Sequence, residues 1–182
     1  MLLRVEDFRL IPARDALRDP RTRHAYLNLL ALLMQEEDVP ATIAQMENDP
    51  LYDPADPFET DDLHEFVLTD DRQRMLGTAT LEHNQDEILM NDAVHPAEVG
   101  KGYGSIILAH EIKKGEELGF ANLKASVYDP ENRPSYQRFE RLCDAGLANR
   151  QPVPEFRGLP VRAYRVPTHY PVRAYYTALL PQ

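Results

Sequence analysis

The fold of this chain is decided by residues 93–105, which read Ala93-Val94-His95-Pro96-Ala97-Glu98-Val99-Gly100-Lys101-Gly102-Tyr103-Gly104-Ser105. This stretch contains three of the eight glycines, follows a predicted strand and opens a predicted helix. Glycines leave no Cβ atom to block a phosphate group, and the first turn of a helix presents unpaired N–H groups with a partial positive charge. The stretch therefore predicts an anion site, although a tight strand-to-helix turn also uses glycine.

The segments on either side predict a sheet with a helix laid across it. Three strand-like segments joined by short polar turns precede the stretch, at 65–69, 74–82 and 86–94. They predict an antiparallel meander. After the stretch, residues 102–118 read as a helix that Gly119 ends, and 122–128 alternates apolar and polar residues like a strand. The glycine-rich stretch thus lies inside a predicted β-α-β unit.

The N-terminal part predicts a strand followed by two amphipathic helices. Residues 8–12 read as the strand, and Asp19-Pro20 supplies an N-cap and a first-turn proline for a helix. Its apolar side chains recur at helical spacing, at Tyr26, Leu29, Leu30 and Leu33. A second helix is expected over 39–46. Residues 47–65 are acidic and rich in proline, which predicts a surface loop.

The C-terminal part predicts one more helix and two terminal strands. Pro134 suits the first turn of a helix that ends before Gly146. The ranges 160–166 and 171–180 are rich in Val, Tyr and Arg, which favours strands, and their prolines favour edge positions in the sheet.

Composition narrows the classes of protein that fit. The chain has 182 residues, of which 43% are hydrophobic and 27% charged, as expected for one globular domain. A formal net charge of −10 disfavours binding to nucleic acid or to an anionic membrane. The apolar stretches are far shorter than the roughly 20 residues that span a bilayer. No signal peptide is recognisable, and Cys143 is the single cysteine, so a reducing cytoplasm is the expected location.

The glycine-rich stretch, with the residues that follow the next strand, resembles the GNAT superfamily of N-acetyltransferases. In that family a strand ending in V-x-P leads into R/Q-x-x-G-x-G/A, and V-x-x-x-N follows a later strand. Here Val94-His95-Pro96 matches the first pattern, and Val127 and Asn132 correspond to the last one with one extra residue between them. The resemblance covers about residues 8–166. It implies an α+β fold of three layers, with a mostly antiparallel, twisted sheet that splays between its fourth and fifth strands. The expectation is a single acyl-CoA-binding domain over 1–182, with a C-terminal strand extension at 167–182.

The resemblance also implies the cofactor-binding residues. Backbone N–H groups of residues 99–105 would hold the pyrophosphate of acetyl-CoA, while Val94 and Asn132 would contact its pantetheine arm. The implied set is Val94, Val99, Gly100, Lys101, Gly102, Tyr103, Gly104, Ser105 and Asn132, with no metal ion. A helix cap is an alternative role for Asn132 that is compatible with this one.

Two positions depart from the family pattern. Val99 stands where Arg or Gln is usual, so one side-chain contact to phosphate is missing. Phe139 stands where family members commonly have the tyrosine that protonates the departing thiolate, and Tyr136, one helical turn earlier, is the nearest replacement unless it is a core aromatic. Asp92, near the end of the fourth strand, is the candidate proton acceptor, with Glu87 as the alternative.

The leading functional hypothesis is transfer of an acetyl group from acetyl-CoA to a primary amine of a small molecule or peptide. The acidic segment 47–65 favours a cationic acceptor, unless it is simply a solvated loop. A non-catalytic acyl-CoA-binding sensor or interaction module is the alternative, because Phe139 replaces the tyrosine. A nucleotide-phosphate binder rests on the glycines alone, and Asn132 argues against it. No nucleic acid or membrane partner is expected, and the sequence leaves a homodimer open.

Overall fold

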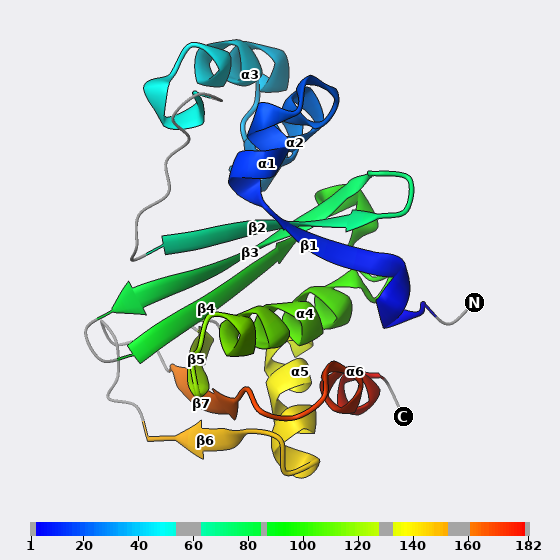
Figure 1. Cartoon of the computed structure of the whole chain (residues 1–182), viewed down its shortest axis with the longest axis vertical. Helices are drawn as coiled ribbons and strands as arrows, with labels where there is room; N and C mark the ends of the chain where they lie inside the picture. Colours follow the sequence, from blue (N-terminus) through cyan, green and yellow to red (C-terminus); the bar gives the residue numbers. More distant parts are fainter. Residues whose placement is uncertain (1–2, 54–62, 85–86, 128–132, 153–160, 181–182) are drawn as a thin grey trace.

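The computed structural model of the chain describes residues 3–53, 63–84, 87–127, 133–152 and 161–180 (Figure 1). Its centre is a sheet in the order β1-β2-β3-β4-β5-β7-β6. The strands are β1 (Phe8–Pro12), β2 (Leu63–Asp70), β3 (Met75–Asn84), β4 (Glu87–Val94), β5 (Asn122–Val127), β6 (Asn149–Gln151) and β7 (Arg162–Pro167). All neighbouring strands pair antiparallel except β4 and β5, which are parallel. The expected meander is confirmed as β2, β3 and β4.

Helices cover both faces of this sheet, so the three-layer α+β expectation is confirmed. They are α1 (Ala13–Arg18), α2 (Pro20–Leu33), α3 (Val39–Glu47), α4 (Tyr103–Glu117), α5 (Arg133–Asp144) and α6 (Val172–Leu179). In Figure 1, α1 to α3 lie on one side of the sheet and α4 to α6 on the other. Two buried apolar clusters match this division, a smaller one under α1 to α3 and a larger one that includes most of the buried face of α4.

Local signals explain where the helices begin. The Asp19 carboxylate accepts a hydrogen bond from the Arg21 N–H at 2.9 Å, which is the N-cap expected for α2. The Asp38 carboxylate caps α3 in the same way, through the Ala41 N–H. Helix α4 begins after Gly102, which has a left-handed backbone with φ of +90°. Few residues other than glycine tolerate that conformation.

The parallel pair β4 and β5 separates toward its C-terminal ends. Within the described residues these two strands share a single register pair, Leu89 with Lys124. Beyond it, the Asn91 N–H of β4 donates instead to the Glu111 carboxylate of α4, at 3.1 Å. A carboxylate from a helix therefore satisfies a strand donor without β5. This arrangement agrees with the splay that the family resemblance implies.

The C-terminal strand predicted at 171–180, and with it the strand extension at 167–182, is wrong. Residues 172–179 form α6, which buries Tyr175, Tyr176 and Leu179 against α4 and α5. Aromatic residues favour strands locally, but this spacing puts all three side chains on one helical face, and packing decides between the two structures. Pro171 is compatible with both, since it also suits the position before a helix.

Two elements were missed because they are short. Helix α1 spans six residues and β6 spans three. None of the helices in the described ranges is long and apolar enough to span a membrane.

Candidate functional site

The glycine-rich loop lies where the sequence places it, between the end of β4 and the start of α4. A short 3-10 turn at Pro96–Glu98 follows β4. Gly100 has φ of +83° and Gly102 φ of +90°, so both adopt left-handed conformations. A Cβ atom at Gly100 would meet no other atom within 4 Å, so this glycine serves backbone conformation rather than packing. We call residues 99–105 the phosphate loop.

The backbone of the phosphate loop leaves donors free. Three of its N–H groups bond to nearby carbonyl oxygens, those of Val99, Lys101 and Ser105. Within the part of the chain that the structure describes, four N–H groups have no acceptor, those of Gly100, Gly102, Tyr103 and Gly104. The Gly102 N-cap has no side chain that could bond to the first turn of α4. Free donors at a helix N-terminus form an anion site, because the helix dipole adds a partial positive charge.

The side chains of the phosphate loop have other partners. Val99 is 66% exposed, and the Lys101 ammonium pairs with the Glu98 carboxylate at 2.9 Å. That contact lowers the pKa of Glu98. Tyr103 is buried edge-on against the Phe8 ring, and the Ser105 hydroxyl donates to the Leu179 carbonyl of α6 at 3.5 Å. The loop therefore offers main-chain donors to a ligand, while the side chains of Tyr103 and Ser105 anchor it to Phe8 and to α6.

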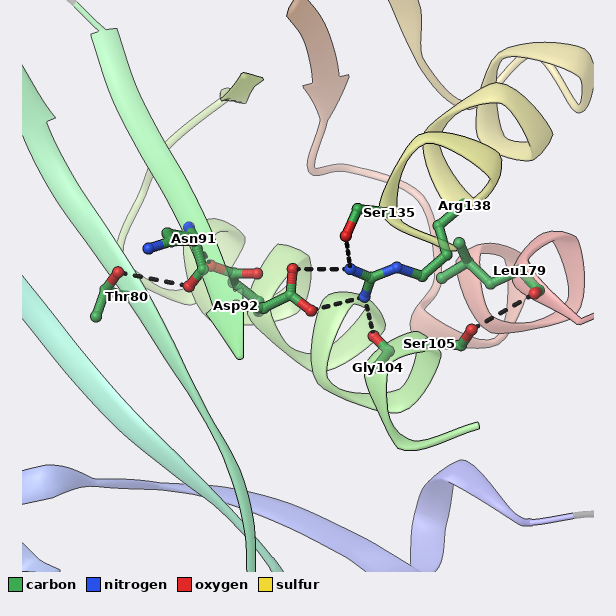
Figure 2. A network of polar contacts seen from close by, with 9 residues as sticks. Thr80, Asn91, Asp92, Gly104, Ser105, Ser135, Arg138 and Leu179 are labelled. Carbon is green, nitrogen blue, oxygen red and sulfur yellow. Dashed lines mark hydrogen bonds and ion pairs between the residues drawn. The ribbon is translucent and has the colours of Figure 1, made fainter. Parts of the chain in front are cut away.

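An arginine that the sequence analysis did not single out connects the phosphate loop to β4 and α5 (Figure 2). The Arg138 guanidinium donates to both oxygens of the Asp92 carboxylate, at 2.6 and 3.1 Å. It also donates to the Gly104 carbonyl oxygen and to the Ser135 hydroxyl. The side chains of Arg138 and Asp92 are only 11% and 10% exposed. We call these four residues the Arg138 clamp.

The clamp explains the glycine at position 104. A Cβ atom there would come within 3.0 Å of Arg138 Nη1 and within 3.4 Å of Val94 Cγ2. A larger residue would push the guanidinium away from the carbonyl oxygen that it holds. The sequence predicted Gly104 as a phosphate-loop residue, and the structure adds a packing reason for it.

The clamp also bears on the predicted proton acceptor, Asp92. Both of its carboxylate oxygens accept hydrogen bonds from the Arg138 guanidinium, so neither oxygen of this buried side chain is without a partner. Asp92 is thus better placed to fix Arg138 than to move a proton. The alternative, Glu87, lies at the other end of β4 and pairs with Lys124.

A second buried carboxylate accompanies the clamp. Glu111 of α4 is fully buried, and its Oε1 accepts from the Asn91 N–H. Its Oε2 has no hydrogen-bond partner among the described residues. Burial, and then the negative charge of Asp92, raises the pKa of Glu111 well above its usual value, so the protonated form is favoured.

Tyr136 lies on α5 and faces β7. Its hydroxyl oxygen accepts a hydrogen bond from Arg162 Nη1 at 2.6 Å, and the Arg162 guanidinium lies 4.2 Å from the centre of its ring. Because the oxygen accepts from arginine, the hydroxyl proton remains available for donation. Phe139, at the position usual for the family tyrosine, is buried and stacked on Tyr164 with ring centres 4.9 Å apart.

Val94 and Asn132 are the two residues predicted to contact the pantetheine arm, and the structure describes only the first. Val94 ends β4 directly before the phosphate loop, is half-buried and lies in register with Gly77 of β3. Asn132 lies outside the described residues.

The sheet face under α2 and α3 holds a carboxylate that the sequence analysis did not select. Glu65 of β2 is half-buried and accepts a hydrogen bond from the Tyr26 hydroxyl. Burial raises the pKa of Glu65. The strand register sets Glu65 beside Thr80, and Thr80 beside Asn91 of β4. Paired residues share a face, so a polar row runs across the sheet toward β4. Its sequence signal was an acidic residue inside an otherwise apolar strand.

The class to which this chain belongs follows from its comparison with known proteins. The sequence profile of the acetyltransferase (GNAT) family matches residues 26–144. The chain therefore belongs to the GNAT acetyltransferase family and is an acyltransferase. No curated protein matches its sequence significantly.

Solved structures agree with this fold. A chimera of the spermidine N-acetyltransferase from Vibrio cholerae and hSSAT superposes with a TM-score of 0.59 and 17% identity, over 94% of this chain and 99% of that one. A GNAT-family protein from Desulfovibrio desulfuricans gives 0.58 and 18%, over 88% and 98%. The Vibrio cholerae spermidine N-acetyltransferase in complex with CoA and spermine gives 0.55 and 15%, over 93% and 98%. At such identities the likeness concerns the fold alone.

Proposed function

We propose that this protein transfers an acetyl group from acetyl-CoA to a primary amine of a small molecule or peptide. The observation that carries the proposal is a set of four N–H groups of the phosphate loop that have no acceptor among the described residues, at the edge where β4 and β5 separate. A pyrophosphate is the anion that such a loop would hold in an acyltransferase. Its thioester would then lie between the two strands, along Val94.

The residues around the loop fit acetyl-CoA as a substrate. Gly100 and Gly102 leave the approach to the loop free of Cβ atoms, and the first turn of α4 supplies partial positive charge. The Arg138 clamp ties that turn to β4 and to α5, which begins at Arg133. Positioning of this kind lowers the barrier because the reacting groups are held close before reaction.

The chemistry requires one proton to leave the amine and one to reach sulfur. The neutral amine nitrogen attacks the thioester carbonyl carbon, the C–N bond forms, and the C–S bond breaks with its electron pair moving to sulfur. We assign Tyr136 as the acid that protonates the thiolate, because its hydroxyl accepts from Arg162 and keeps its proton for donation. The proton of the amine leaves through water, and Tyr136 regains its proton from solvent.

The substrate that accepts the acetyl group is expected to be a cationic amine. The protein carries a formal charge of −10, and Glu65 places a half-buried carboxylate on the sheet face under α2 and α3. The structural neighbour named as a spermidine N-acetyltransferase was solved with spermine bound. Glu65 would hold an ammonium group of the acceptor that does not react, while the amine at the other end reaches the thioester.

A thiol-release assay tests the proposal. Acetyl-CoA is incubated with the protein and a panel of amines that includes spermidine, a diamine, an amino acid and a lysine-containing peptide, and free CoA is measured against time. Amine-dependent release supports the proposal, with higher kcat/KM for the polycationic acceptors. Tight acetyl-CoA binding without release for any amine would contradict it and support the binding module that Phe139 suggests.

A further inference from the structure

The end of the β4–β5 pair opposite the phosphate loop holds a cavity of about 600 Å³. Its walls come from the starts of β4 and β5, the loop after α4 and the neighbouring strands. We call it the seam pocket, and the side chains that matter for the argument are His83, Glu87, Phe120, Lys124, Gln151 and Arg165. Its volume falls in the range of about 300–1,000 Å³ typical of small-molecule sites.

The described lining of the seam pocket carries two cations, Lys124 and Arg165, and one carboxylate, Glu87, in a protein that is acidic as a whole. Lys124 of β5 and Arg165 of β7 lie directly opposite each other in the antiparallel register. Like charges in that position repel. The Glu87 carboxylate pairs with the Lys124 ammonium, and Arg165 has no ion pair within the described residues. One guanidinium with five N–H donors is therefore left over beside the cavity.

The backbone around the pocket does not compete for a ligand. The carbonyl oxygen of Phe120 accepts from the Thr168 hydroxyl, and that of Ala121 accepts from the Thr168 N–H at 3.2 Å. The N–H groups of Gly119 and Phe120 bond back to the last turn of α4. Carbonyl oxygens near a helix C-terminus would repel an anion, but those of Gly115, Glu116, Phe120 and Ala121 accept these hydrogen bonds. Side chains therefore decide what binds.

One wall of the pocket is apolar. Phe120 is half-buried, and its ring meets the His83 ring edge-on with centres 5.0 Å apart. Ile88 and Leu123 continue this wall. A ligand that fits must therefore present a negative group to Arg165 and an apolar body to Phe120.

We propose that the seam pocket binds a small organic anion, a carboxylate or phosphate attached to an apolar ring or chain. The guanidinium of Arg165 matches the planar fork of a carboxylate or two oxygens of a phosphate. A bound anion also relieves the repulsion between Arg165 and Lys124. The ligand stacks its apolar part against Phe120, and the Gln151 amide lies within the lining to accept or donate.

This site is separate from the acyl-CoA site. The Leu89–Lys124 register pair joins β4 to β5 at this end, whereas the phosphate loop follows Val94 at the other end of β4. Five residues of extended strand separate Leu89 from Val94, which is roughly 17 Å. The inference therefore does not depend on which amine the enzyme acetylates.

Chemical-shift mapping on the full-length, isotope-labelled protein tests the proposal. Benzoate and phenyl phosphate are titrated as the two anions, and benzamide serves as the neutral analogue of the same shape. We expect saturable shifts at Gly119, Ala121 and Lys124 with a dissociation constant of about 1 mM for at least one anion. Benzamide should give at least about ten-fold weaker binding. Equal binding of benzamide, or no saturable shift with either anion, would overturn the proposal.

Two variants separate this site from the phosphate loop. Arg165→Gln should weaken anion binding about ten-fold or more, while Arg173→Gln, which removes an exposed charge on α6, should leave it unchanged. Phenyl phosphate can also reach the phosphate loop, and shifts at Gly100 and Gly102 report that event. The proposal would be overturned if Gly102→Glu abolished phenyl phosphate binding, Arg165→Gln kept it, and benzoate did not bind at all. Acetyl-CoA affinity, measured in parallel, tests the proposed function independently.

Discussion

The two ends of the β4–β5 pair use charge in opposite ways. At the phosphate-loop end the strands have separated, and one buried guanidinium is bound to a carboxylate, a carbonyl oxygen and a hydroxyl. At the seam-pocket end the strands are joined, and an exposed guanidinium lies opposite a lysine. A buried charge must be fully paired, whereas an exposed one can remain available. The clamp at the first end therefore holds the phosphate loop in a fixed position, whereas the Arg165 guanidinium at the second end is available to bind a ligand.

The largest effect is expected from a negative side chain in the phosphate loop. Gly102→Glu should abolish acetyl-CoA binding, because the carboxylate would lie beside the pyrophosphate. Gly119→Glu is the matched control, since Gly119 has φ of +89° and suffers the same backbone strain at the other end of α4. Isothermal titration of both folded variants gives the answer. Wild-type affinity in Gly102→Glu would remove the pyrophosphate assignment.

Removing the central cation of the clamp should cost the most stability. Arg138→Met leaves the Asp92 carboxylate buried without a counter-charge, and we expect the free energy of unfolding to fall by about 3–5 kcal/mol in urea titrations. Arg138→Lys should lose an intermediate amount of unfolding free energy, since an ammonium cannot bridge both oxygens of the Asp92 carboxylate. Arg173→Met is the exposed control. A loss below about 1 kcal/mol for Arg138→Met would mean that the clamp behaves as a surface pair.

Loss of the proposed acid should reduce turnover without affecting cofactor binding. Tyr136→Phe is expected to lower kcat by about ten- to a hundred-fold while acetyl-CoA affinity stays constant. Phe139→Tyr serves as the comparison and should change little, because that ring is stacked on Tyr164 in the core. If Tyr136→Phe keeps full turnover, the tyrosine is structural and the thiolate is protonated by solvent.

The pH dependence of stability should reveal Glu111. Its pKa is raised in the fold, so between its usual value of 4.5 and the folded value the native state holds more protons than the unfolded state. Stability is therefore retained below pH 4.5 and declines as pH rises through the folded pKa. Glu111→Gln removes this decline, so the variant should gain stability relative to the wild type as the pH rises above 4.5. Parallel curves for the two proteins would show that Glu111 is ionised in both states.

The smallest effect is expected at the seam pocket. Arg165→Thr removes the repulsion from Lys124 and introduces a residue that favours strands, so stability should rise by about 0.2–1 kcal/mol at low salt. Repeating the measurement in about 0.5 M NaCl should shrink the gain, because salt screens exposed charges. A gain that does not depend on salt would point to strand propensity alone.

Much of the fold could be predicted because its signals are local. The Asp19-Pro20 cap, the polar turns of the meander and the left-handed glycines each depend on a few adjacent residues. Helix α6 was assigned wrongly because Tyr and Val favour strands locally, while contacts with distant helices decide the outcome. In a segment as short as residues 171–180, the pattern of apolar residues alone does not distinguish a strand from a helix.

The clamp was missed for a different reason. Arg138 and Asp92 are 46 residues apart, so no spacing in the sequence relates them. A charged residue near the end of an apolar strand, such as Asp92, indicates a partner of opposite charge, since a buried carboxylate needs one. Glu111 gave a similar signal, because it stands four residues after Ile107 on the buried face of α4. Such positions identify a buried polar network, but only the fold gives its partners.

The contacts at the two ends of the chain have a practical consequence for anyone who expresses this enzyme. The Tyr176 hydroxyl of α6 donates to the Leu3 carbonyl oxygen, and the Leu179 carbonyl oxygen is held by Ser105 and Arg141. Both ends of the described chain lie on the same side of the molecule (Figure 1). A Cβ atom at Gly102 would lie 3.6 Å from the Leu3 side chain, so an affinity tag added at either end of the described chain would approach the phosphate loop in space. Cofactor affinities should therefore be measured after the tag is cleaved.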